Sequence, residues 1–142
     1  AVIAVFHDVL IVLSIFSIFY GILPFSLEID QAFIAAILTI IGYSLNDTVV
    51  VFDRIREHMG LFKKKDFTEL VNNALNSTLS RTVNTSLTTF FVLLVIFLFG
   101  GEVIRGFMFA LMVGVVVGTY SSLFVASPIM LDTLKKTEEN KK

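Results

Sequence analysis

Residues 41–57 have the sequence IGYSLNDTVVVFDRIRE, in which polar side chains interrupt a long apolar stretch. Asp47 lies inside that stretch, and the charged run that follows it starts at Asp53. In a helix this spacing corresponds to roughly 9 Å, farther than a short carboxylate side chain can reach. An aspartate at the centre of a membrane-spanning helix costs about 2.5–3.5 kcal/mol. We therefore expect Asp47 to have a polar partner, a water-filled cavity or a bound proton.

The composition extends this interpretation to the whole chain. Hydrophobic residues make up 56% of the 142 residues and charged residues 16%, whereas soluble domains average roughly 45–50% and about 25%. Long apolar runs with few charges cover residues 1–23, 32–52, 82–99 and 106–131. Each run is close to the ~20 residues that span a bilayer. The sequence predicts an all-α, polytopic helical membrane protein with four transmembrane helices, and argues against a soluble or disordered chain.

Lysine and arginine predict the orientation of these spans. They are concentrated in the loop between the second and third spans and after the fourth span, and such loops face the cytoplasm. We expect one partial transmembrane domain over residues 1–142, with a cytoplasmic loop over 53–80 and a cytoplasmic tail over 132–142. The loop should contain an amphipathic helix, either on the inner membrane surface or packed on the bundle. Because the chain starts without Met or a basic leader, we expect a piece of a longer polypeptide.

Several classes of function are disfavoured by what the sequence lacks. The net charge is −1, so no basic surplus indicates a nucleic-acid partner, and cysteine is absent. The two histidines, His7 and His58, lie in different segments, which leaves little for a metal cluster. The sequence has no phosphate-binding glycine loop and no nucleophilic triad at a plausible position. We expect neither an enzyme nor a cofactor.

The third span contains the natural partner for Asp47. The second and third spans are antiparallel and joined on the cytoplasmic side, so Arg81 should lie at the same depth as Asp47. A carboxylate poised between an arginine and an apolar environment suits a proton relay, with Asn46, Tyr43 and Thr85 as supporting hydrogen-bond partners. Two alternatives stay open: Asp47 is a static hydrogen-bonded group, or Arg81 extends to the lipid headgroups.

The first and fourth spans add two further expectations. Asp8 follows His7 in the first span, and it either faces the same interior and joins the relay or forms an interfacial pair with the histidine. The fourth span has small residues at every fourth position, which predicts close helix packing. These helix-packing residues are Gly106, Ala110, Gly114, Gly118 and Ser122.

The motif in residues 42–57 closely resembles the signature of the SecF family of protein-export membrane proteins. Further matching segments occur in the same order along the chain, at residues 6–9, 78–86, 99–101 and 125–127. The resemblance implies helices three to six of a six-helix half of the RND superfamily fold. It also implies that Asp47 and Arg81 take part in proton conduction.

For the intact protein, the resemblance implies an auxiliary of Sec-dependent protein translocation that is driven by the proton-motive force, in the bacterial inner (cytoplasmic) membrane. Its implied partners are SecD or the SecD half of a fusion, the SecYEG translocon, the translocating polypeptide, the lipid bilayer and protons. The alternative is an RND-type proton-driven exporter of lipids or small molecules, which would share the fold and the intramembrane aspartate.

Overall fold

The structure, a computed structural model, describes residues 1–61 and 67–139 and is built from helices. No strand occurs among those residues. The elements are α1 (Val2–Phe19), α2 (Gln31–Leu61), α3 (Phe67–Phe99), α4 (Glu102–Ser121), the π-helical turn η1 (Ser122–Ala126) and α5 (Ser127–Glu139). Within the described residues, 4 helices are long and apolar enough to cross a membrane, with α4, η1 and the start of α5 forming the last one. The prediction of an all-α membrane protein with four spans is confirmed.

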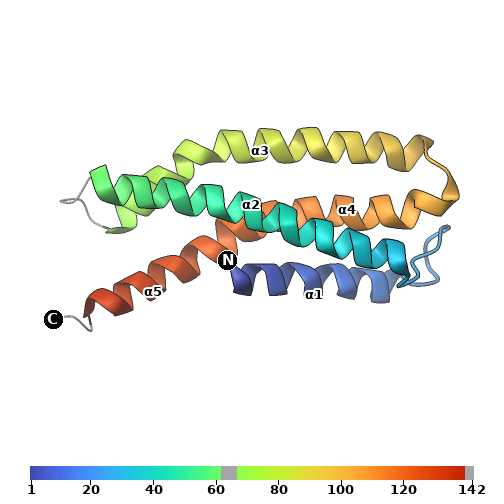
Figure 1. The fold of residues 1–142 in the computed structure, drawn as a ribbon, viewed down its shortest axis with the longest axis horizontal. Coiled ribbons are helices and arrows are strands. Elements are labelled where there is room, and N and C mark those ends of the chain that lie inside the picture. The colour runs from blue at the N-terminus through green and yellow to red at the C-terminus, as the bar shows by residue number, and fades with distance from the viewer. Residues whose placement is uncertain (62–66, 140–142) are drawn as a thin grey trace.

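Helices α2 and α4 form the centre of the bundle, with α1 and α3 on opposite sides of it (Figure 1). The main core cluster joins α1, α2 and α4 and includes Val12, Phe16, Phe33, Ile40 and Leu111. Its aromatic rings pack directly, since the Phe16 and Phe33 ring centroids are 4.5 Å apart. The packing contacts in this half of the molecule therefore place α1 and α4 around the first turns of α2.

A second, smaller core lies at the other end of α2, where the helix continues past the apolar stretch to Leu61. Val51 and Ile55 of α2 pack there against Val71 and Ala74 of α3. This contact explains a difference from the expected boundaries. Residues 67–80 are not a separate amphipathic helix but the first part of α3, because their apolar face is buried on α2 and the helix then runs on without a break to Phe99. Residues 62–66 of the expected loop and 140–142 of the tail lie outside the described residues.

The connection between α1 and α2 turns back at a single residue in the left-handed region. Gly21 has φ +75, a conformation that residues with a Cβ adopt only at a cost. Asp30 then caps α2, because its Oδ1 accepts a hydrogen bond of 2.8 Å from the backbone N–H of Phe33. These two residues fix where the first span ends and the second begins.

Candidate functional site

Asp47 lies half-buried on the side of α2 that faces α3. Its Oδ2 atom is buried, and so is the hydroxyl of Thr82 on α3, yet neither atom has a hydrogen-bond partner among the described residues. The two side chains are close enough to interact. Buried polar atoms without a partner are uncommon and costly. The pair therefore marks a polar contact between α2 and α3 within their apolar stretches.

Arg81 precedes Thr82 on α3 and interacts electrostatically with Asp47. Its side chain is exposed, and the salt bridges found among the described residues do not include this pair. The structure thus brings the two predicted residues near one another without direct ionic contact. An arginine near Asp47 but without a direct ion pair still feels the charge of the carboxylate through Coulomb attraction.

An open pocket of about 300 Å³ lies between α2 and α3 at their charged end. Its lining residues are polar except for one, and they are Val50, Asp53, Arg54, Glu57, Ser77, Thr78 and Arg81. Val50 is one helical turn from Asp47, and Thr78 is one turn from Thr82, so the pocket begins next to the unpaired polar atoms. Arg81 belongs to both places, because it lines the pocket and acts on Asp47.

The other expected relay residues on α2 and α3 do not gather around Asp47. The hydroxyl of Tyr43 donates a hydrogen bond of 3.1 Å to Ser86 of α3. Asn46 and Thr85 are exposed, and the Thr85 hydroxyl donates to the Arg81 carbonyl of its own helix at 2.8 Å. Tyr43 therefore connects two helices, whereas Asn46 and Thr85 lie on the outer surface of this bundle.

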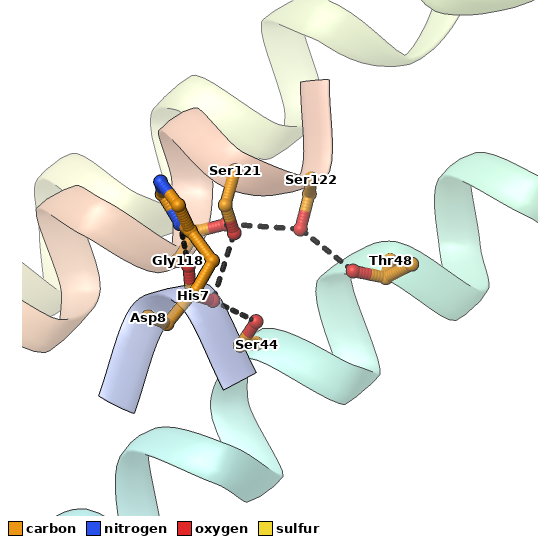
Figure 2. A network of polar contacts seen from close by, with 7 residues as sticks. All are labelled: His7, Asp8, Ser44, Thr48, Gly118, Ser121 and Ser122. Atoms are coloured by element: carbon orange, nitrogen blue, oxygen red, sulfur yellow. Dashed lines mark hydrogen bonds and ion pairs between the residues drawn. The ribbon is translucent and has the colours of Figure 1, made fainter. Parts of the chain in front are cut away.

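Asp8 is buried and lies at the centre of a second polar network (Figure 2). Its Oδ2 atom accepts hydrogen bonds from Ser44 of α2 at 2.5 Å and from Ser121 of α4 at 2.8 Å. Its Oδ1 atom is 3.0 Å from Nδ1 of His7. Asp8 does face the interior, but it contacts Ser44 of α2 and Ser121 of α4 rather than Asp47 and Arg81.

The π-helical turn Ser122–Ala126 lies beside this network and was not expected from the sequence. Thr48 and Ser122 form a buried hydroxyl contact of 2.9 Å, and the Ser127 hydroxyl donates to the Ser122 carbonyl at 3.0 Å. Ser122 also interacts with Asp47. Single π-turns within α-helices are frequent at functional sites. The sequence held little signal for this site, because Ser122 fitted the four-residue packing pattern of the fourth span and Ser121 was not singled out.

The small-residue face of α4 lies directly against α2. A Cβ placed on Gly114 would overlap the side chain of Ile40, and one placed on Gly118 would be 3.3 Å from Cβ of Ser44. A Cβ on Gly106 would be 2.5 Å from the carbonyl oxygen of Ser26. Ala110 is also buried on α4. The close approach at Gly118 is what allows Ser44 and Ser121 to reach the same oxygen of Asp8.

Comparison with known proteins places this architecture in one family. Residues 1–136 match the family model described as protein export membrane protein SecD/SecF, C-terminal. The protein translocase subunit SecF of Rhodothermus marinus is 67% identical over 132 residues, which cover 93% of this chain and 43% of the relative. The SecF of Petrotoga mobilis is 45% identical over 142 residues, which cover 100% of this chain and 45% of the relative.

The fold is also that of a solved relative. A crystal structure of SecDF in a super-membrane-facing form has a TM-score of 0.82 and 42% identity, and the match covers 98% of this chain and 19% of that chain. The chain spans less than half the length of the two SecF relatives. A family model matched over nearly the whole sequence, together with four apolar spanning helices, shows that this chain belongs to the SecD/SecF family of multi-pass protein-export membrane proteins and corresponds to its C-terminal region.

Proposed function

We propose that this chain is the C-terminal membrane part of a subunit that uses proton movement to assist Sec-dependent protein export. Asp47 would bind the transported proton and Arg81 would respond to the resulting change in charge. The single observation that best supports this is that Asp47, half-buried within a membrane-spanning helix, interacts with Arg81 and with the buried Thr82 hydroxyl of α3. A carboxyl group inside a span is costly and commonly functional.

The pocket at the charged end of α2 and α3 supports a route for the proton. Its polar lining includes Asp53, Glu57 and Arg81, so water can approach the turn that separates it from Asp47. A proton that crosses the membrane potential releases roughly 2.3 kcal/mol per 100 mV. Protonation removes the charge that attracts Arg81, and the relative position of α2 and α3 can then change.

The outer face of α2 and α3 supports a partner in the membrane. Its exposed polar side chains lie on helices that are otherwise apolar, and they include Asn46, Arg81, Asn84, Thr85 and Thr88. Polar groups of this kind are expensive against lipid and normally face protein or water. We propose that SecD, or the SecD half of a fused protein, covers this face. Asn46 and Thr85 would then be buried in the interface and could act as hydrogen-bond partners in the relay.

The SecF names of its relatives support a location in the bacterial inner membrane. The positive-inside rule supports an orientation with the α2–α3 connection and the C-terminus in the cytoplasm. SecYEG and the translocating polypeptide would bind to other parts of the intact complex. The SecF names of its relatives favour protein export over the alternative of an RND-type exporter of lipids or small molecules. Crosslinking of the intact complex to an exported polypeptide distinguishes the two, because an exporter of small molecules should not capture one.

The proposed function is tested by Asp47→Asn in the full-length protein together with its partner. We expect loss of proton-dependent export in inverted or right-side-out vesicles while the complex still assembles. Asp132→Asn is the matched control, because Asp132 is exposed on α5, and this variant should export normally. Export at the wild-type rate by Asp47→Asn would refute the proposal.

A further inference from the structure

The structure contains a second carboxyl group at membrane depth, whose surroundings differ completely from those of Asp47. Asp8 is 0% exposed and has contacts on both of its oxygens, with Ser44 and Ser121 on Oδ2 and with His7 on Oδ1. Ser44 and Ser121 are the groups that face it from α2 and α4, and neither titrates near neutral pH. Among the described residues, the titratable group in contact with Asp8 is His7.

His7 gives Asp8 a connection to the outside of the bundle. The imidazole is 34% exposed, whereas the Asp8 side chain is 1% exposed. The Nδ1 atom of the imidazole, which can carry a proton, lies 3.0 Å from Oδ1 of Asp8. A proton can therefore pass from imidazolium Nδ1 to Oδ1, which leaves a neutral histidine and a neutral carboxyl group, so that charge is conserved in the step.

The two carboxyl groups are approached by consecutive residues, Ser121 at the end of α4 and Ser122 at the start of η1. Ser121 turns toward Asp8 at 2.8 Å, whereas the next residue, Ser122, contacts Thr48 and interacts with Asp47. Figure 2 shows the point where the two branches meet, at the carbonyl oxygen of Gly118. The hydroxyls of Ser121 and Ser122 are both within hydrogen-bond distance of that oxygen, at 3.3 Å and 2.9 Å.

The number of hydroxyl protons available explains how protonation of Asp8 can affect Asp47. Each serine has one hydroxyl proton to donate. While Asp8 is ionised, Ser121 donates to Asp8, and Ser122 donates to the Gly118 carbonyl. The Gly118 carbonyl also accepts the backbone N–H of Ser122, so it has room for one hydroxyl donor. Once Asp8 is protonated, Ser121 can take that position, and the proton of Ser122 can turn to Thr48 or to ionised Asp47. A proton on Asp8 therefore disfavours a proton on Asp47.

We propose that Asp8 is a second proton-binding group, and that it is coupled to Asp47 through the hydroxyls of Ser121 and Ser122 at the start of the π-turn. The coupling rests on the proposed function, because it requires that Asp47 binds protons. By linkage the effect is reciprocal, so that each carboxyl group changes proton binding by the other to the same degree. The π-turn is then the element of the fold that senses both protons.

The test is infrared titration of protonated carboxyl groups in the full-length protein with its partner, in lipid nanodiscs. Asp47→Asn should leave a titrating carboxyl band that disappears when Asp8→Asn is added. In Asp8→Asn alone, the midpoint for Asp47 should move by about one pH unit or more, a tenfold change in its protonated fraction. If Asp8→Asn fails to assemble, Ser121→Ala should still move that midpoint. Ser14→Ala should not, because among the described residues the Ser14 hydroxyl donates to the Leu10 carbonyl of its own helix.

The outcomes separate the two proposals. A band for Asp47 that titrates, with no band lost on adding Asp8→Asn, overturns the second site and leaves the proposed function intact. An Asp47 midpoint that is the same in wild type, Asp8→Asn and Ser121→Ala overturns the coupling alone. A missing Asp47 band overturns the coupling and the proposed function together, whereas the titrating band of Asp8 would still establish Asp8 as a proton-binding group.

Discussion

Replacement of Gly114 by alanine tests the close packing of α4 on α2, on which both polar sites depend. A Cβ at this position would overlap Cγ1 and Cδ1 of Ile40 and would lie 2.9 Å from its Cγ2. Ile40 is 1% exposed and belongs to the main core cluster. Its side chain therefore has no free space to rotate into, and the two helices have to separate.

The expected change in the free energy of unfolding follows from two opposing effects. Overpacking of a well-packed core costs about 1–3 kcal/mol. An alanine within a helix is favoured over glycine by about 0.5–1 kcal/mol. Helix association in lipid depends on packing rather than on the hydrophobic effect, so lost contacts are not compensated by burial elsewhere. We expect Gly114→Ala to destabilise the protein by about 1–2 kcal/mol.

Two other glycines supply graded controls within the same bundle. A Cβ at Gly118 would lie 3.3 Å from Cβ of Ser44, a contact that needs only a small adjustment, whereas one at Gly42 would have nothing within 4 Å. Gly118→Ala should therefore be near neutral, and Gly42→Ala should stabilise by up to about 1 kcal/mol. Gly42→Ala should be the most stable of the three variants, Gly118→Ala the next, and Gly114→Ala the least stable.

The measurement is reversible unfolding of the full-length protein in mixed micelles with increasing SDS. A compensating substitution sharpens it, because Ile40→Ala removes all three atoms that the new Cβ would meet. Ile40→Ala alone should cost about 2–5 kcal/mol, and the double variant should be at least about 1 kcal/mol more stable than the sum of the two single effects. Additive effects, or a Gly114→Ala variant as stable as Gly42→Ala, would refute the reasoning.

Three further predictions concern stability measured in the same way. Ser44→Ala removes a donor to buried Asp8 and should cost about 1–3 kcal/mol; a loss no greater than that of Ser14→Ala would contradict the role of Ser44 in the network. Gly21→Ala should cost about 1–2 kcal/mol because of its positive φ alone, since no atom lies within 4 Å of the added Cβ; a neutral effect would show that the turn relaxes. Arg54→Ala breaks an exposed ion pair and should cost less than about 1 kcal/mol, so a larger loss would show that the pocket is buried by a partner.

The sequence by itself determined the spans and the most probable polar site. Hydrophobicity over about twenty residues is a local property, so the four apolar runs appear as spanning helices whatever their neighbours are. The depth of a residue along a helix is equally local. Asp47 and Arg81 could therefore be placed at the same level before their mutual approach was known, and the spacing of Gly114 and Gly118 predicted one narrow helix face.

Only the tertiary structure decided which faces meet. Residues on one helix point in different directions, and their partners depend on how distant helices rotate against each other. Asn46 and Thr85 share the depth of Asp47 but lie on the outer surface of the bundle. Asp8 was an open alternative in the sequence and became a buried centre because Ser44 and Ser121 reach it from two other helices.

The hydroxyl network and the π-turn have the same physical origin. A serine or threonine in a helix can donate to a carbonyl of its own preceding turn or to a neighbouring helix, and the sequence is the same in both cases. Thr85 donates to a carbonyl of its own helix, whereas Ser44 donates to Asp8 of a neighbouring helix. Ser122 makes contacts of both kinds, with the Gly118 carbonyl of its own helix and with Thr48 of α2. The second contact depends on how α2 packs against η1, which no local pattern encodes.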